Sequence, residues 1–307
     1  MTSFELRQYS LLFLTAVLWG TGFIGQKLGM DHVEPFTFTF MRTLIGGLFL
    51  LPVMAAMNGI KRKRGITVRR SDKKTLMLGS LCCGTCLICA ESFQQFGIQI
   101  SDVTSTSFIT SLYVVFVPIF GIFIGSRPSP KLVLCVAISV AGLYLLTASG
   151  GLHFSKGNLL TLIGAMCFAV HILVIAYFVA RVDGVALSCG QFFVASFLGF
   201  IMMVATGGDT LENFMKAAPA FIYCGIVSNG IAYTLQVVGQ RGVNPIIATI
   251  IMSLESVMGT FFGIVLLGES PTTVQLIGCA LVFTAVILAQ VPVAALARKA
   301  GFIKSKA

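Results

Sequence analysis

The stretch from Asn158 to Ala180, NLLTLIGAMCFAVHILVIAYFVA, decides the fold class of this chain. It contains no Asp, Glu, Lys or Arg. His171 is the one residue of this stretch whose side chain ordinarily changes charge near neutral pH. A helix needs about 20 mostly apolar residues to cross the hydrocarbon core of a bilayer. We therefore predict that this stretch forms a membrane-spanning helix.

Runs of the same kind recur along the whole chain. Of the 307 residues, 56% are hydrophobic and only 10% are charged, whereas a soluble domain carries about 25% charged residues. This composition excludes a soluble enzyme and favours a polytopic membrane protein. We predict an all-α fold with ten transmembrane helices, at residues 10–29, 36–56, 75–98, 102–124, 131–149, 158–180, 186–206, 214–238, 244–267 and 273–292.

The basic residues of the loops fall on one side of this predicted bundle. With a cytoplasmic N-terminus, the basic loop 57–74 and the cluster 298–306 lie inside, and only Lys156 and Lys216 lie outside. By the positive-inside rule, we predict a multi-pass protein of the cytoplasmic (inner) membrane with both termini cytoplasmic. The run from Ser10 has no small-residue cleavage site after it, so we expect it to remain as the first span. The formal charge of +10 is then explained by orientation and by anionic lipid of the bilayer, and no nucleic-acid partner is expected.

The nine cysteines lie almost entirely within apolar runs, which argues against a disulfide framework. Cys83, Cys86 and Cys89 have overlapping C-x-x-C spacings, but a zinc site usually takes ligands from separate elements. Cysteine also packs as a small hydrophobic residue. We expect no metal and no cofactor.

The two halves of the chain repeat one another. A shift of 142 residues places Gln236 on Gln94 and Ser253-Leu254 on Ser111-Leu112, and a shift of 149 places Arg42 on Gln191. Each unit has an odd number of spans, so the second unit must enter the membrane from the opposite side. We predict two inverted five-helix repeats, residues 1–150 and 151–307.

Several motifs resemble those of one transporter family. They are Trp19-Gly20-Thr21-Gly22-Phe23 with Lys27, Phe40-Met41-Arg42, and Ser253-Leu254-Glu255 followed by Gly268-Glu269 and Gly278. In these motifs the chain resembles EamA-type members of the drug/metabolite transporter superfamily, over nearly its whole length. The resemblance implies a ten-helix inner-membrane carrier, often an exporter of amino acids or other small metabolites. Many relatives have proline where this chain has Ser256, which leaves open whether the helix bends there.

Charged side chains inside spans are costly and need a partner, a water-filled cavity or a function. Arg42 and Glu91 both lie roughly 10 Å below the outer surface, by a rise of 1.5 Å per residue, so an ion pair between them is possible. Such a pair can be a structural staple or a gate beside the binding site. Lys27 is nearer the surface and is expected to extend to it.

Glu255 and His171 lie near the middle of their spans, where carriers bind their cargo. Either side chain can exchange a proton during a transport cycle, which makes proton coupling a hypothesis. The structural alternative for Glu255 is a hydrogen bond that joins span 9 to span 6 or 7. For His171 it is a hydrogen bond to a backbone carbonyl.

Aromatic and amide side chains complete the predicted binding site. An aromatic pocket with a carboxylate suits an organic amine or an apolar amino acid. Trp19 and Tyr113 carry polar groups that need partners within a span, and symmetry favours Gln94 and Gln236 over other glutamines. The predicted substrate-binding residues are Trp19, Glu91, Gln94, Tyr113, His171, Tyr233, Gln236 and Glu255.

The leading functional hypothesis is a secondary carrier that moves a small organic solute by alternating access, in the export direction. No nucleotide motif such as G-x-x-x-x-G-K-[ST] is present, so a gradient must supply the energy. A membrane enzyme would need a third member beside His171 and Glu255, and a non-transporting sensor or scaffold is the alternative reading. The pairs Gly25/Gly29, Gly121/Gly125 and Gly259/Gly263 fit close helix packing within a monomer or a homodimer.

Overall fold

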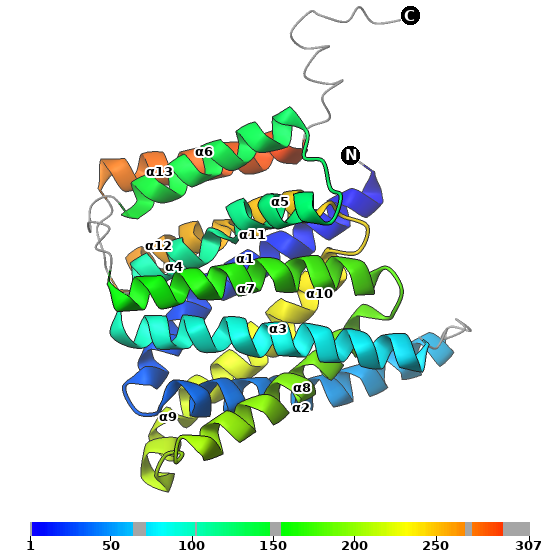
Figure 1. Cartoon of the computed structure of the whole chain (residues 1–307), viewed down its shortest axis with the longest axis vertical. Coiled ribbons are helices and arrows are strands. Elements are labelled where there is room, and N and C mark those ends of the chain that lie inside the picture. Colours follow the sequence, from blue (N-terminus) through cyan, green and yellow to red (C-terminus); the bar gives the residue numbers. More distant parts are fainter. Residues whose placement is uncertain (1, 64–71, 102, 148–154, 268–271, 291–307) are drawn as a thin grey trace, which may run out of the picture.

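The computed structural model describes residues 2–63, 72–101, 103–147, 155–267 and 272–290, and every regular element within these ranges is a helix (Figure 1). In chain order these are α1 (Ser3–Met30), α2 (Pro35–Lys63), α3 (Lys73–Ile100), α4 (Val103–Ser111), α5 (Tyr113–Phe123), α6 (Pro130–Thr147), α7 (Lys156–Val179), α8 (Gly184–Ala205), α9 (Leu211–Tyr223), the π-helix η1 (Cys224–Tyr233), α10 (Thr234–Gly239), α11 (Pro245–Met252), α12 (Leu254–Leu267) and α13 (Thr273–Gln290).

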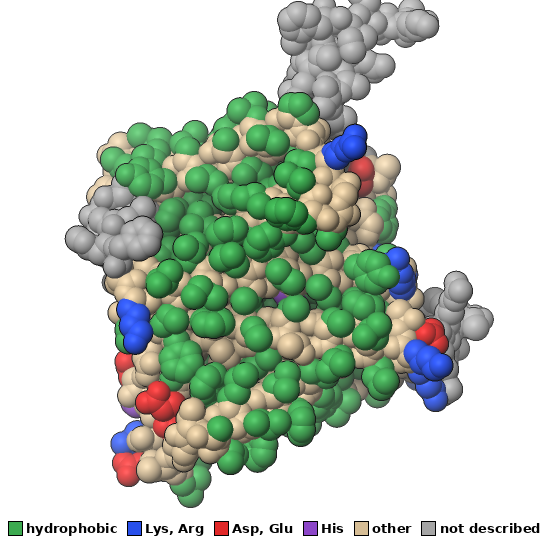
Figure 2. Space-filling view, viewed as in Figure 1, with side chains coloured by type: hydrophobic (Ala, Val, Ile, Leu, Met, Phe, Trp, Pro, Cys, Tyr) green, Lys and Arg blue, Asp and Glu red, His purple; other side chains and the backbone are tan. Residues whose placement is uncertain are grey.

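Most of these helices can cross a bilayer. In the described part of the chain, 9 helical segments are long and apolar enough, and the segment Pro130–Leu145 is apolar but shorter. Charged side chains gather at two opposite edges of a broad hydrophobic surface (Figure 2). The prediction of an all-α, multi-pass membrane protein is therefore confirmed. The predicted boundary at residue 150 falls outside the described residues, and the division into inverted repeats stays a prediction.

The two ends of the bundle are named here by the first helix. The Gln8 end is the end at which α1 begins, and the Met30 end is the end at which α1 finishes. α2 continues to Lys63, beyond the predicted end at residue 56, since basic residues are favourable in the last turn of a helix. Residues 64–71 of the basic loop, the cluster 298–306 and the motif residues Gly268 and Glu269 lie outside the described residues, so the cytoplasmic orientation of the Gln8 end stays a prediction.

Three predicted spans are not single α-helices. The span 102–124 is divided at Leu112, and the span 244–267 is divided at Ser253. These breaks occupy nearly equivalent places in the two halves of the chain. The Ser253 hydroxyl donates to the Ile250 carbonyl (2.8 Å), and such a local bond competes with the regular helix pattern. The helix thus breaks without a proline at Ser256.

The span 214–238 contains the π-helix η1 between two α-helices. Glycines let η1 lie against α2 at very short distance. A Cβ atom on Gly225 would come within 2.6 Å of Ile45, and one on Gly230 within 2.7 Å of Phe49. Because π-helices are rare and commonly occur at functional sites, this segment directs attention to the side chains it presents.

An apolar cluster fills the Met30 end of the bundle. We call it the Phe23 cluster; its buried members are Phe23, Met30, Val33, Phe38, Ile98, Ala217, Phe221 and Cys224. Beside it, the Lys27 side chain is half-buried. Its Nζ donates to the carbonyls of Ile98 (2.9 Å), Gln99 (3.3 Å) and Ser101 (3.0 Å), where α3 ends. The carbonyls at a helix C-terminus lack intrahelical partners, which explains this position of the ammonium group.

The pair Gly25/Gly29 packs closely against other helices of the same chain. A Cβ on Gly29 would overlap the Phe38 ring, and one on Gly25 would meet Cys224 Sγ at 2.9 Å. A Cβ on Gly20 would come within 2.8 Å of the Gly259 nitrogen, so α1 and α12 cross in close contact. Gly125 has a φ of 84°, which favours glycine, and lies just beyond the end of α5.

Candidate functional site

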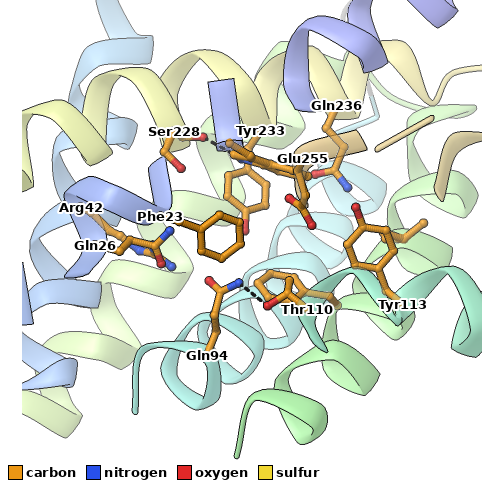
Figure 3. Close-up of a pocket in the computed structure, with 13 residues that line it drawn as sticks. Phe23, Gln26, Arg42, Gln94, Thr110, Tyr113, Ser228, Tyr233, Gln236 and Glu255 are labelled. Atoms are coloured by element: carbon orange, nitrogen blue, oxygen red, sulfur yellow. Dashed lines mark hydrogen bonds between the residues drawn. The ribbon is translucent and has the colours of Figure 1, made fainter. Parts of the chain in front are cut away.

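A pocket lies in the middle of the bundle, between helices of both halves of the chain (Figure 3). The empty space between its lining atoms amounts to about 400 Å³, a volume that includes space open to solvent. It is lined by Trp19, Phe23, Gln26, Arg42, Gln94, Thr110, Tyr113, Phe168, Ile172, Ser228, Tyr233, Gln236 and Glu255. The lining thus combines aromatic rings, neutral amides and hydroxyls, and two charged side chains.

One end of the pocket holds Arg42 beside Gln26 (Figure 3). Arg42 Nε donates to Glu91 Oε2 (3.1 Å), and its terminal nitrogen lies 3.1 Å from Glu91 Oε1. Asn229 Nδ2 also donates to Glu91 Oε1 (3.2 Å). All three side chains are buried. The Arg42–Glu91–Asn229 cluster therefore joins α2 and α3 to η1, with Arg42 facing the pocket and Glu91 behind it.

The opposite end of the pocket holds Glu255, with Tyr113 and Gln236 beside it (Figure 3). Glu255 Oε1 accepts a hydrogen bond from Ser111 Oγ (3.2 Å), and only 2% of its surface is exposed. None of the ion pairs between described residues includes Glu255. The expected partner on span 6 or 7 is wrong, because the hydrogen bond of Glu255 joins α12 to Ser111 on α4. The carboxyl group remains available on its pocket side.

Ser256 supports this end of the pocket from behind. Its hydroxyl lies 2.7 Å from Ser111 Oγ and donates to the Ser107 carbonyl (2.9 Å). These bonds connect the first turn of α12 to α4. Together with the breaks at Leu112 and Ser253, they place Ser111 and Glu255 against each other.

Aromatic rings lie between the two polar ends. Trp19 and Tyr233 make an edge contact with ring centroids 4.8 Å apart, and Trp19 Nε1 donates to the Ser228 carbonyl (3.3 Å). Phe23 projects into the space between Arg42 and Glu255 (Figure 3). Rings in these positions can stack on an apolar group or contact a cation through their faces.

The predicted residues do not all reach the pocket. Glu91 contacts it only through Arg42. His171 lies behind Tyr233, with ring centroids 6.1 Å apart, and its Nε2 lies 3.0 Å from Gln191 Oε1. The expected bond of His171 to a backbone carbonyl is thus replaced by a side-chain partner. The other predicted residues line the pocket: Trp19, Arg42, Gln94, Tyr113, Tyr233, Gln236 and Glu255.

The structure adds polar residues that the sequence did not single out. Gln26 follows Trp19 and Phe23 at helical spacing, so the sequence could have predicted that it lies on the same helix face. The Thr110 hydroxyl lines the pocket and accepts a hydrogen bond from Gln94 Nε2 (3.0 Å). Asn229 depends on the π-helical turn of η1, which no sequence pattern indicated. Within the described ranges, no group of His, Cys, Asp and Glu is arranged to hold a metal ion.

Comparison with known proteins identifies the family. The model of the EamA-like transporter family matches the chain twice, over residues 6–148 and 155–290. The chain belongs to the EamA-like transporter family. It is 28% identical over 282 residues to an uncharacterized transporter of Archaeoglobus fulgidus, covering 90% of this chain and 83% of that protein. A second uncharacterized transporter of that organism is 25% identical, with coverage of 89% and 93%. One of Clostridium kluyveri is 22% identical, with coverage of 85% and 86%.

The fold recurs in a crystal structure that is 20% identical to this EamA-like chain. The match has a TM-score of 0.73 and covers 95% of this chain and 98% of the other. At this identity the likeness establishes the fold alone. Family membership and the transporter relatives establish that the protein is a membrane transporter for a small molecule.

Proposed function

We propose that this transporter moves a small organic solute carrying a positive charge, such as an amine or an amino acid, across the cytoplasmic membrane by alternating access. The observation that carries the proposal is the environment of the Glu255 carboxyl group. This group is buried, lines the pocket, accepts a hydrogen bond from Ser111, and forms no ion pair with a described residue. The aromatic lining favours a solute with an apolar portion.

Charge balance around the pocket supports a cationic solute. Arg42 and Glu91 neutralise each other, so Glu255 contributes one unbalanced negative charge when it is ionised. An isolated charge is costly at membrane depth. Either a proton or a cationic group of the solute removes that cost. If Glu255 binds either a proton or the cationic solute, but never both at once, solute movement is coupled to a proton gradient. We propose this coupling for the transport cycle.

The polar groups at the two ends support a solute with two polar parts. A cationic group fits at Glu255, while Gln26 and the donors of Arg42 offer hydrogen bonds to an acceptor at the opposite end of the pocket (Figure 3). The two repeats would move as units around this central pocket. We propose export as the direction of transport, on the strength of the family resemblance, and we propose a monomer or homodimer as the working unit.

Flux measurements in proteoliposomes test this function. A panel of radiolabelled amines, amino acids and matched uncharged analogues is loaded into vesicles, with and without a pH gradient. We expect flux of cationic or zwitterionic members that responds to the pH gradient, and its loss in Glu255→Gln. Equal flux of the uncharged analogues, or no dependence on pH, would contradict the proposal. Empty vesicles and a Glu212→Gln protein, changed at an exposed carboxylate, serve as controls.

A further inference from the structure

Gln240 is a buried polar residue that the pocket does not account for. It caps α10 at the Gln8 end, one helical turn after Gln236, and only 1% of its surface is exposed. Neither Oε1 nor Nε2 of its amide has a hydrogen-bond partner among the described residues. A buried amide without partners is costly, and more so in a protein surrounded by hydrocarbon.

The position of Gln240 relates it to the pocket. Gln236 lines the pocket, and its Oε1 also has no partner among the described residues. The backbone N–H of Gln240 donates to the backbone carbonyl of Gln236 (2.8 Å), so the helical turn between the two residues is intact. Side chains four residues apart lie on one helix face. The two amides therefore form a polar line that leads from the pocket toward the Gln8 end.

The other half of the chain shows that the fold does not require a polar residue here. The 142-residue shift that places Gln236 on Gln94 places Gln240 on Ile98. Ile98 is fully buried in the Phe23 cluster, which closes the Met30 end with apolar side chains. Gln26 and Gln95 also carry unpartnered oxygens, but each of these two amides has one such atom, whereas both polar atoms of the Gln240 amide lack a partner among the described residues. Equivalent positions are thus apolar at one end of the bundle and polar at the other.

The contacts of α1 differ between the two ends in the same sense. At the Met30 end, the Lys27 ammonium group holds three carbonyls at the end of α3. At the Gln8 end, the neutral Gln8 amide donates to Val238 O (2.7 Å) and Arg241 O (3.0 Å) at the end of α10. Hydrogen bonds to a charged group are about twice as strong as neutral ones. The contact between α1 and α10 is therefore the easier of the two to separate.

We propose that Gln240 lines the passage by which water and the transported solute move between the pocket and the Gln8 end, between α1 and α10. When the passage is open, water and the solute supply the hydrogen-bond partners that the buried Gln240 amide lacks in this structure. It acts on hydrophilic solutes, whose polar groups it hydrogen-bonds during passage. The inference rests on the proposed transport function, and its first test does not depend on flux.

Thiol labelling tests whether this passage is hydrated. In a protein whose nine native cysteines are replaced, single cysteines are placed at Gln240, Gln236 and Ile98, and each is reacted with 2-aminoethyl methanethiosulfonate in detergent. The cysteine thiolate attacks the sulfenyl sulfur of this reagent and displaces methanesulfinate. Because the thiolate forms in water, we expect Gln240→Cys to react at least about tenfold faster than the equivalent Ile98→Cys. Equal or slower reaction at Gln240 would overturn the proposal, whether or not the protein transports a solute in vesicles.

Substitution by leucine provides the second test. Gln240→Leu removes the unpartnered amide, so we expect a thermal unfolding temperature equal to or above that of the native protein. We expect its flux of the solute identified in proteoliposomes to fall at least about tenfold, since the passage loses its polar lining. The matched control is Gln8→Leu, which removes bonded donors and lowers thermal stability. Native flux in a well-folded Gln240→Leu protein would make Gln240 a packing residue and overturn the proposal.

Discussion

Arg42 and Glu91 form a fully buried ion pair in which Arg42 Nε donates to Glu91 Oε2 over 3.1 Å. The pair joins α2 to α3 directly beside the pocket. Because Asn229 occupies Glu91 Oε1 as well, the carboxylate has a donor on each oxygen. Satisfied in this way, the pair can persist at membrane depth, where an unpaired charge is costly. Its position at the pocket wall fits both a staple and a gate.

A double-mutant cycle separates a coupled pair from two independent residues. We expect Arg42→Gln and Glu91→Gln each to lower the free energy of unfolding by about 3–5 kcal/mol, because each leaves one buried charge unpaired. The double substitution removes both charges, and we expect it to impair stability and transport less than either single change. Thermal unfolding and flux are measured on all four proteins. Effects that add within about 0.5 kcal/mol would show that the two residues act independently.

Substitutions of Asn229 test the third member of this cluster. Asn229→Leu removes the donor to Glu91 at similar volume, and we expect a loss of about 1–3 kcal/mol of stability. Asn229→Asp places a second carboxylate beside Glu91. The repulsion disappears once one of the two carboxylates takes up a proton, so we expect the stability deficit of Asn229→Asp to shrink as the pH falls. The deficit of Asn229→Leu should change less with pH, because leucine adds no second carboxylate, and this difference makes it the control.

Composition and the length of the apolar runs were sufficient to predict the class of fold. Each described helix overlaps a predicted span, because hydrocarbon thickness sets the length of a spanning segment. The sequence did not show that Leu112 and Ser253 interrupt their spans, nor that Cys224–Tyr233 winds as a π-helix. The length criterion does not mark these points, because each predicted span continues across them. The breaks depend on hydrogen bonds of serine hydroxyls and on glycine contacts with neighbouring helices, which are tertiary features.

The candidate site was predictable to the extent that depth and residue type determine it. Glu255 was singled out by its mid-span depth, Trp19 by its polar indole group and Gln94 by the repeat symmetry, and the structure brings them to one pocket. The sequence did not predict a role for Asn229, because an isolated asparagine in a span does not indicate which side chain it hydrogen-bonds. His171 is as central as Glu255 but lies one layer behind the pocket, against Gln191. Sequence gives the depth of a residue in the membrane but not the direction in which its side chain points.

The membrane orientation can be tested with a cysteine at Asn58. We predict that the loop 57–74 is cytoplasmic, because its cations outnumber those of any other loop. Asn58→Cys should resist an impermeant maleimide added outside intact cells and react after the membrane is made permeable. A cysteine at Leu211, which lies at the Met30 end and is 77% exposed, should react in intact cells. Reaction of Asn58→Cys in intact cells would reverse the topology.

Proline scanning tests the break that precedes Glu255. Ser256 lies in the first turn of α12, and its N–H makes only a 3.4 Å bond to the Ser253 carbonyl. Proline is tolerated in a first turn because the N–H there is normally unpaired. We expect Ser256→Pro to cost about 1–2 kcal/mol, mainly through loss of the hydroxyl bonds to Ser111 and Ser107. Thr260→Pro, one turn later, should cost about 3 kcal/mol or more. Equal losses of thermal stability would show that α11 and α12 form one continuous helix.

Glu255→Gln tests the centre of the proposed mechanism. Glutamine keeps the shape of the side chain and can still accept from Ser111, so we expect an intact fold. If Glu255 binds a proton or the cationic group of the solute in turn, the variant should lose pH-driven flux by at least about a hundredfold, a difference of about 2.7 kcal/mol. Glu255→Ala should lose stability as well, since Ser111 then lacks this acceptor. Flux is measured at several pH values alongside thermal unfolding. Native rates in a well-folded Glu255→Gln protein would give Glu255 a helix-packing role and shift attention to Arg42, Gln94 and Tyr113.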